Sequence, residues 1–343
     1  MTTKLADPYN KYKLEKKNVC LFTRIRGRRV TWEVSHTCNM RCLHCCQGDL
    51  KRNAKNAALP EKRYAEIVEK LKMLDTTAVY ISGGEPFLVP HFGRILSLLK
   101  SKNIYTSVAT NGMVLDKRKI SMLTKNNVDK ILISLDHHKP EYHDGMRGKN
   151  GAWSLVTQRI KNAAEAGLYV RIGTTIWKQM CSFEDLSKFV EMGIELGAGE
   201  IAFNWIMRVG NARKNSDIFP ERSWFDITGD LDSIRRMYGT DILITYKPFE
   251  KLEGDVEGCR GGSNFFHIAY NGKVTPCSWI GKCDMGGIHQ PFFVWDVGSD
   301  KELTALFEPF RGYISDNEKR LGPFCPVVNY TFSGDYLHTD PRR

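Results

Sequence analysis

Long apolar runs are missing from this chain of 343 residues. No run approaches the roughly 20 apolar residues of a membrane-spanning helix, and the N-terminus lacks the apolar core of a secretory signal. Internal repeats and low-complexity segments are absent as well. These absences argue against a membrane protein or a repeat protein, and we expect a cytoplasmic protein with a large folded core.

Positive charge is abundant, but little of it lies beyond the N-terminal segment. The formal net charge is +11, and residues 1–30 hold nine basic and two acidic residues, so this segment accounts for seven of the eleven charges. A basic surface spread over the whole molecule, as nucleic-acid binding requires, is therefore not expected. The segment is interpreted as a basic arm.

Ten cysteines are present, clustered rather than evenly spread, which favours metal binding in a reducing compartment over disulfides. Cys38, Cys42 and Cys45 form a C-x3-C-x2-C pattern. Three thiolates at this spacing can bind three irons of a [4Fe–4S] cube and leave the fourth iron open. The alternative is zinc, which favours paired C-x2-C motifs with four ligands, and no second pair lies within the next hundred residues.

A glycine-rich turn follows an apolar run at 78–81 that is typical of a buried strand. It reads Ser82-Gly83-Gly84-Glu85-Pro86. Glycines at a strand end let a ligand approach the backbone, and Glu85 offers a carboxylate to an ammonium group.

The cysteine triad followed about forty residues later by Gly-Gly-Glu-Pro resembles the radical S-adenosylmethionine (SAM) superfamily. The resemblance implies that SAM binds the open iron through its amino and carboxylate groups, and that Gly83, Gly84 and Glu85 hold the amino group. It also implies the reaction: reductive cleavage of SAM to a 5′-deoxyadenosyl radical, which takes a hydrogen atom from an unactivated C–H bond.

Further motifs extend the resemblance along the chain. Asn111 lies in Ala-Thr-Asn-Gly, Ser134 and Asp136 in Ser-Leu-Asp, and Arg147 in His-Asp-Gly-Met-Arg-Gly. In the family, residues matching Ser134 and Arg147 contact the ribose or carboxylate of SAM. The position before the third cysteine, usually an aromatic residue near adenine, is His44. A simpler interpretation of Asp136 and Arg147 is an ordinary ion pair at a loop.

Strand and helix patterns alternate from the cysteine motif to about residue 206. We expect an α/β fold, a partial (β/α)6 TIM-type barrel, with every motif at the carboxyl end of a strand. The expected strands are 30–35, 78–81, 104–109, 130–135, 169–175 and 201–206. The expected helices are 61–74, 90–101, one from Asp116, 152–166 and 183–196.

The C-terminal part, beyond residue 250, differs from the barrel because its expected strands are short. A β-hairpin is expected around Asn271-Gly272, and four cysteines surround it, Cys259, Cys277, Cys283 and Cys325. The pattern is similar to the opening of the SPASM and twitch extensions, which implies one auxiliary [4Fe–4S] cluster, because a full SPASM domain needs seven or so cysteines. Free or zinc-binding thiols are the alternative. The expected domains are 1–30 (basic arm), 31–210 (barrel), 211–254 (connecting segment) and 255–343 (auxiliary-cluster domain and tail).

Of these four cysteines, Cys283 is the one whose role the sequence determines least. As fourth ligand it would complete the auxiliary cluster, which favours an electron acceptor and net oxidation of the substrate. As a free thiol at the barrel mouth it would be a candidate hydrogen donor, which favours epimerisation. Ligation is the preferred interpretation, because a thiolate so close to a cluster usually joins it.

The substrate is the least constrained part of the prediction. The barrel begins near residue 31, which leaves no room before it for a fused peptide-recognition domain, and this favours a small polar biosynthetic intermediate, such as a sugar or aminocyclitol. The alternatives are a peptide maturase, which cross-links or epimerises a ribosomal peptide, and an RNA-modifying enzyme. An acidic electron donor, flavodoxin or ferredoxin, is the expected protein partner, with the basic arm as its dock.

Overall fold

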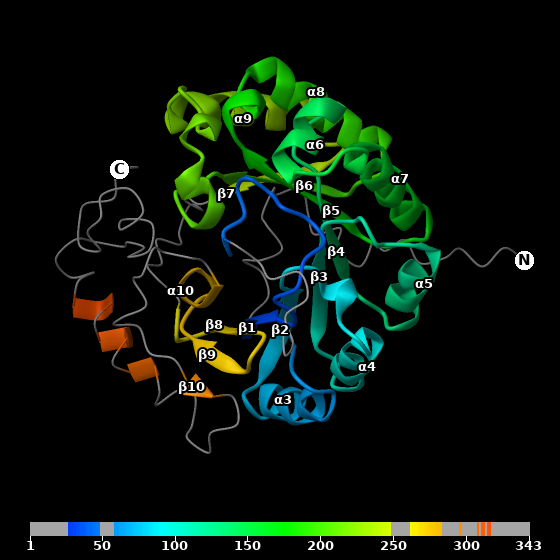
Figure 1. Cartoon of the computed structure of the whole chain (residues 1–343), viewed down its shortest axis with the longest axis vertical. Helices are drawn as coiled ribbons and strands as arrows, with labels where there is room; N and C mark the ends of the chain where they lie inside the picture. Colours follow the sequence, from blue (N-terminus) through cyan, green and yellow to red (C-terminus); the bar gives the residue numbers. More distant parts are fainter. Residues whose placement is uncertain are drawn as a thin grey trace, which may run out of the picture.

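The computed structural model describes residues 27–48, 58–247, 261–282, 295–296, 307–308, 310–312 and 314–316 (Figure 1). Its core is one sheet of ten strands. The strands are β1 (Arg28–Glu33), β2 (Thr76–Ser82), β3 (Tyr105–Thr110), β4 (Lys130–Ser134), β5 (Val170–Ile176), β6 (Glu200–Trp205), β7 (Leu243–Lys247), β8 (Phe265–Ile268), β9 (Lys273–Thr275) and β10 (Trp295–Asp296).

The sheet is parallel from β1 to β7, with strand order β10-β9-β8-β1-β2-β3-β4-β5-β6-β7. Because β10 and β7 lie at its two ends, the sheet curls without closing, as a partial barrel. The expected fold class is confirmed, and all six expected strands are present. A seventh parallel strand, β7, lies in the segment 211–254. From the sequence, this segment was expected to be only a connection.

Helices cover the outer face of the curled sheet (Figure 1). They are α3 (Lys62–Met73), α4 (Phe92–Ser101), α5 (Lys117–Lys125), α6 (Pro140–Arg147), α7 (Ala152–Glu165), α8 (Phe183–Glu195) and α9 (Trp224–Tyr238). The short helix α10 (Ser278–Lys282) lies beside β8 and β9 instead, and the described chain also has the 3-10 turns η1 (Pro86–Leu88), η2 (Lys178–Met180), η3 (Gly210–Lys214) and η4 (Ser216–Ile218). Several begin at a side-chain cap: Asp116, Ser182 and Ser223 each accept a bond from the N–H three residues on.

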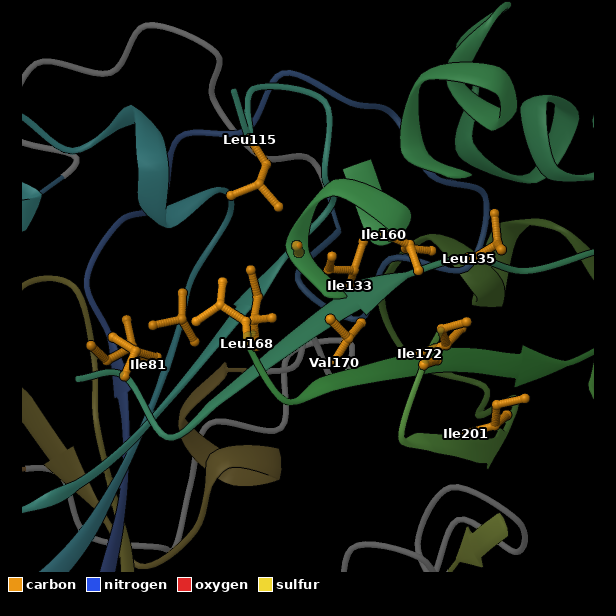
Figure 2. Packing of buried hydrophobic residues seen from close by; sticks show 14 of the residues in the cluster. Ile81, Leu115, Ile133, Leu135, Ile160, Leu168, Val170, Ile172 and Ile201 are labelled. Atoms are coloured by element: carbon orange, nitrogen blue, oxygen red, sulfur yellow. The ribbon is translucent and has the colours of Figure 1, made fainter. Parts of the chain in front are cut away.

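Alternate residues of each strand meet these helices and form the core. Ile133, Val170, Ile172 and Ile201 are fully or almost fully buried and gather against Ile160 of α7 (Figure 2). Each such side chain contributes roughly 1.5–3 kcal/mol on leaving water. This core fixes the positions of the strand ends that carry the motifs.

An ion cluster seals the opposite, amino-terminal end of the barrel. The Lys130 ammonium lies 2.6 Å from Glu200, and Arg171 lies 3.2 Å from the other carboxylate oxygen. Burial raises the pKa of Glu200, but Arg171 and Lys130 more than offset this and hold it below its ordinary value. These residues are the first or second of their strands, so the ion cluster occupies the amino-terminal end and leaves the carboxyl ends for the candidate site.

The expected hairpin is confirmed, and it extends the barrel sheet. Strand β8 pairs in parallel with β1, and β9 pairs antiparallel with β8. The turn needs Gly272, whose φ is +81°, and the Asn271 side chain accepts from the Lys273 N–H (3.2 Å). The C-terminal segment is therefore joined to the barrel through backbone pairing.

Strand β1 begins earlier than expected and includes residues assigned to the basic arm. Arg29 is buried, and the Arg28 guanidinium donates to the Leu74 carbonyl (2.7 Å). Long basic side chains can pack their apolar stems while the charged end finds an acceptor. Residues 1–26 lie outside the described part, and in that part no helix is long and apolar enough to cross a membrane.

Candidate SAM and iron–sulfur site

The cysteine loop follows β1 at the carboxyl edge of the sheet. It leaves the strand with the Val34 N–H bound to the Ser82 carbonyl (2.9 Å), and a turn then brings the Cys45 N–H to the Cys42 carbonyl (3.3 Å). Cys38 is buried and Cys42 and Cys45 are half-buried. All three expected cluster ligands therefore lie in one loop above the barrel.

Hydrogen-bond donors reach the sulfur atoms of Cys38 and Cys42. The Asn111 amide nitrogen lies 3.7 Å from Cys38 Sγ, and the Arg147 guanidinium lies 3.7 Å from Cys42 Sγ. Burial raises the pKa of both thiols, so they are poor isolated thiolates. Bound iron would stabilise the thiolate form of such buried cysteines, and hydrogen bonds to the sulfur atoms would adjust the reduction potential of the cluster. The residues around the loop therefore fit an iron–sulfur cluster.

The spacing of the thiols also bears on the zinc alternative. Among the described residues, the set of three ligand atoms mutually within 4.8 Å is His137, His138 and Asp185, not the cysteine triad. Sulfur ligands about 2.3 Å from one zinc ion would be only about 3.8 Å apart. The cysteine triad is not such a close set, and its expected iron–sulfur cluster stays a prediction. The histidine set already has protein partners, including the Gln179 carbonyl for His137 (2.8 Å) and Asp185 for His138 (2.8 Å).

The two glycines allow a close approach between the glycine turn and the cysteine loop. A Cβ on Gly84 would lie 2.2 Å from the Thr37 carbonyl oxygen, and one on Gly83 would lie 2.5 Å from that of Ser35. The Gly84 and Glu85 N–H groups donate to these same carbonyls (2.7 and 2.8 Å). The close approach is therefore to the cysteine loop itself, which the glycine turn holds in place.

Glu85 is completely buried, and its carboxylate already has protein donors. It accepts from the Thr110 hydroxyl (2.8 Å), the Asn111 N–H (2.8 Å) and the Phe87 N–H (3.2 Å). Burial raises its pKa to about 7 in spite of these bonds. The carboxylate thus joins the glycine turn to the end of β3, and its expected contact with the amino group of SAM stays a prediction.

Asp136 and Arg147 form the ion pair that the sequence offered as the simpler interpretation. Arg147 Nε lies 2.6 Å from Asp136 Oδ2, and both residues are buried. Burial raises the pKa of Asp136, but the Arg147 guanidinium, followed by His44 and His143, more than offsets this and holds it below its ordinary value. The pair joins β4 to the last turn of α6, close to the cysteine loop.

His44 lies beside this ion pair, 3.8 Å from Asp136 Oδ2. Burial lowers its pKa to about 4, so the ring is neutral at pH 7. A neutral ring is suited to stacking on a base, and the expected place near adenine stays a prediction. Ser134 is the half-buried last residue of β4, at the same edge of the sheet.

The segment after β6 holds the cysteine loop from another side, and sequence reasoning missed it. The Asn211 N–H donates to the Cys45 carbonyl (2.9 Å), and its side chain donates to the Cys42 carbonyl (3.1 Å). Gly210 has φ +53°, and a Cβ there would lie 2.2 Å from the Cys45 oxygen. Gly210-Asn211 was the available signal, but such a pair occurs in many turns.

In the C-terminal extension, the described part includes one of the four expected auxiliary ligands. Cys277 is half-buried two residues after β9. The Gly262 N–H donates to the Pro276 carbonyl (3.0 Å), so the chain just after position 259 lies against the chain just before Cys277. Cys259, Cys283 and Cys325 lie outside the described residues.

Comparisons with known proteins agree with this geometry. Residues 32–187 match the profile of the Radical SAM superfamily. The chain is 24% identical to the AdoMet-dependent heme synthase of Methanosarcina barkeri, over 92% of this chain and 95% of that protein. It is 27% identical to the antilisterial bacteriocin subtilosin biosynthesis protein AlbA of Bacillus subtilis, over 74% of this chain but only 55% of AlbA.

A solved structure extends the likeness to the fold. The Streptococcus suis protein SuiB bound to the precursor peptide SuiA superposes with a TM-score of 0.73 at 19% identity, covering 99% of this chain and 82% of SuiB. At this identity the likeness concerns the fold, an open sheet with the same arrangement. A Radical SAM domain implies a [4Fe–4S] cluster and SAM, which the residues at the cysteine loop fit. The protein is therefore an enzyme with a radical SAM domain, whose matching core spans residues 32–187.

Proposed function

We propose that the protein is a peptide maturase that uses SAM to generate a radical and modifies a peptide at an unactivated C–H bond. The single observation that carries the proposal is the three-thiol loop held above the open barrel in a chain related to a bacteriocin biosynthesis protein. SuiB, whose fold is similar, is bound to a precursor peptide. A peptide is thus better supported than the sugar-like substrate expected from the sequence.

The residues of this chain would divide the work of binding. Cys38, Cys42 and Cys45 would ligate the cluster, which supplies the electron that cleaves SAM. Arg147, Asn111 and Ser134 would orient SAM above the barrel, with the neutral His44 beside its adenine. Burial of the site would exclude water and competing hydrogen donors.

We also propose one auxiliary [4Fe–4S] cluster, bound by Cys259, Cys277, Cys283 and Cys325. The backbone contact between Gly262 and Pro276 supports it, because it brings the flanks of two of these cysteines together. With Cys283 as ligand, the cluster would accept the second electron of a net oxidation. A free Cys283 would favour epimerisation instead.

A second candidate is a step of heme synthesis. The observation in its favour is that the M. barkeri heme synthase matches along 92% of this chain and 95% of its own length. A porphyrin precursor and a peptide differ in size and rigidity, and the turnover assay described in the next paragraph distinguishes these two candidate substrates.

The test is anaerobic turnover with SAM and dithionite, measuring 5′-deoxyadenosine and product mass. We expect a deuterated precursor peptide to transfer deuterium to 5′-deoxyadenosine, whereas a deuterated porphyrin precursor should not. The matched variant is Cys38→Ala/Cys42→Ala/Cys45→Ala, which should lose SAM cleavage and about four irons while the auxiliary irons remain. Undiminished cleavage by this variant would contradict the site, and transfer from porphyrin alone would overturn the substrate.

A further inference from the structure

Asp136 lies at the centre of a buried polar network beside the cysteine loop. Its Oδ1 accepts from the Thr175 N–H (3.2 Å), and its Oδ2 lies 2.6 Å from Arg147 Nε. Its backbone N–H donates to His143 Nδ1 (3.1 Å), and its carbonyl accepts from the Trp177 indole N–H (3.3 Å). Asp136 itself is completely buried. Contacts from β5, from α6 and from the residue after β5 therefore fix the position of this carboxylate.

Arg147 links this network to a predicted cluster ligand. Its Nε lies against the Asp136 carboxylate, and its Nη1 lies 3.7 Å from Cys42 Sγ. The backbone supports the same approach, because the Leu43 N–H donates to the Met146 carbonyl (2.9 Å). The residue next to Cys42 is thus bound to the residue next to Arg147, and the end of α6 is held against the cysteine loop.

The geometry of the guanidinium depends on the carboxylate. An arginine side chain has many rotamers, but its planar group loses this freedom when Nε is bound to a fixed acceptor. The rings of His44 and His143 are neutral at pH 7, since burial lowers the pKa of both to about 4, so neither adds a second cation here. A cationic donor on a ligand sulfur favours the reduced form of a cluster, which carries one more electron, and so raises its reduction potential.

We propose that Asp136 is a positioning residue that, through Arg147, keeps a charge-assisted hydrogen bond on Cys42 Sγ and thereby raises the reduction potential of the cluster. The inference rests on the part of the proposed function in which Cys42 binds iron. Reduction takes one electron from an external reductant, and no bond forms or breaks. A higher potential makes this electron easier to supply. The ion pair that looks like an ordinary loop contact in the sequence thus acts on the redox chemistry of the site.

The bond to sulfur can be observed directly in the full-length holoenzyme. The probe is protein grown with arginine that carries nitrogen-15 in its guanidinium group, reduced with dithionite without SAM and measured by pulsed electron paramagnetic resonance. We expect a nitrogen-15 coupling to the cluster in the wild type and its loss in Asp136→Asn. The matched control is Asp144→Asn, which should keep the coupling. Asp144 in α6 undergoes the same change of charge, but it binds the Gly151 and Trp153 N–H groups at the start of α7 (2.6 and 2.8 Å).

A redox titration of the same proteins distinguishes positioning from charge compensation. Arg147→Gln removes the donor and should lower the ratio of reduced to oxidised cluster about tenfold at a fixed potential, a shift of about 59 mV to more negative values. Asp136→Asn should shift the potential in the same direction, by about threefold or more in this ratio, and should add no shift in an Arg147→Gln background. Asp144→Asn should change the ratio by less than about twofold. A shift of Asp136→Asn to more positive potential would show that the carboxylate only balances the charge of Arg147, and would overturn the positioning role.

A second variant at the same position is needed because Asp136→Asn leaves a buried guanidinium unpaired, which is costly for folding. Asp136→Glu keeps the charge, but its longer side chain moves the guanidinium from the sulfur, so the coupling should be lost there as well. Absence of the coupling in the wild type, or its presence in any folded variant at position 136, would overturn the role of Asp136 alone. A cluster signal that persists when all three cysteines of the loop are changed to alanine would contradict the proposed site, and the role of Asp136 with it.

Discussion

At the scale of single residues, Glu85 shows how burial changes the meaning of a motif. Its sequence context suggested a carboxylate offered to SAM, but its oxygens accept from Thr110, Asn111 and Phe87. These bonds fix the glycine turn against the end of β3. Three bonds leave a carboxylate able to accept a further donor, so the contact of Glu85 with the SAM amino group stays a prediction.

The raised pKa of Glu85 predicts a pH dependence of stability. The folded protein keeps this proton up to about pH 7, whereas the unfolded chain releases it near 4.5. The contribution of Glu85 is therefore fully present below pH 4.5 and is lost as the pH rises through 7, by an amount on the order of 3 kcal/mol. Glu85→Gln lacks this titration.

Urea unfolding of both proteins between pH 5 and 8 measures the difference. We expect the wild-type free energy of unfolding to fall relative to that of Glu85→Gln across this range. Because other titrating groups are shared, they cancel in the comparison. A constant difference would show that the carboxylate is not shifted.

At the scale of elements, three separate segments hold the cysteine loop. The glycine turn after β2 binds its first part, the Met146 carbonyl of α6 accepts from the Leu43 N–H (2.9 Å), and η3 binds its last part. The loop itself has little regular structure. The geometry of the three thiols therefore depends on these contacts.

Gly210→Ala tests the contact from η3. The new Cβ would meet the Cys45 oxygen at 2.2 Å, and φ +53° is strained for alanine, so we expect a loss of at least about 2 kcal/mol and fewer irons bound. The matched control is Gly145→Ala, in α6, where a Cβ meets nothing within 4 Å and helix propensity favours alanine. Iron analysis and thermal unfolding report both effects. Full iron occupancy in Gly210→Ala would mean that η3 does not shape the loop.

At the scale of the whole molecule, the C-terminal hairpin completes the sheet. Without β8, strand β1 would become an edge, although Val30 and Trp32 are almost fully buried. Phe266 and Ile268 of β8 are equally buried. The extension is therefore part of the barrel's packing as well as the expected carrier of a cluster.

A chain ending at residue 250 is expected to be less stable than the full chain. Losing the burial of Phe266 and Ile268 alone costs roughly 3–6 kcal/mol, and an exposed β1 edge favours aggregation. Thermal unfolding and sedimentation measure both. The control is the full chain with Cys259, Cys277, Cys283 and Cys325 changed to alanine, which keeps the hairpin without its predicted ligands. Equal stability of the truncated and full chains would contradict a packing role.

The sequence by itself determined the family and most of the fold. Strand and helix periods placed six parallel strands in order, and the spacing of Cys38, Cys42 and Cys45 with the glycine turn predicted the candidate site, because both signals are local. It did not predict β7, whose pairing with β6 comes only from tertiary packing. Nor did it predict that β8 joins β1, a contact between segments more than 230 residues apart.

Only the tertiary structure decided what surrounds the thiols. Gly210 and Asn211 reach the cysteine loop from about 165 positions along the chain, and Gly148 approaches the Arg41 carbonyl of the same loop, with no common sequence signal. The donors that Glu85 binds, from Thr110 and Asn111, likewise come from a different strand. Hydrogen bonding and burial depend on which distant backbone atoms come within 3 Å, and local sequence patterns do not encode that.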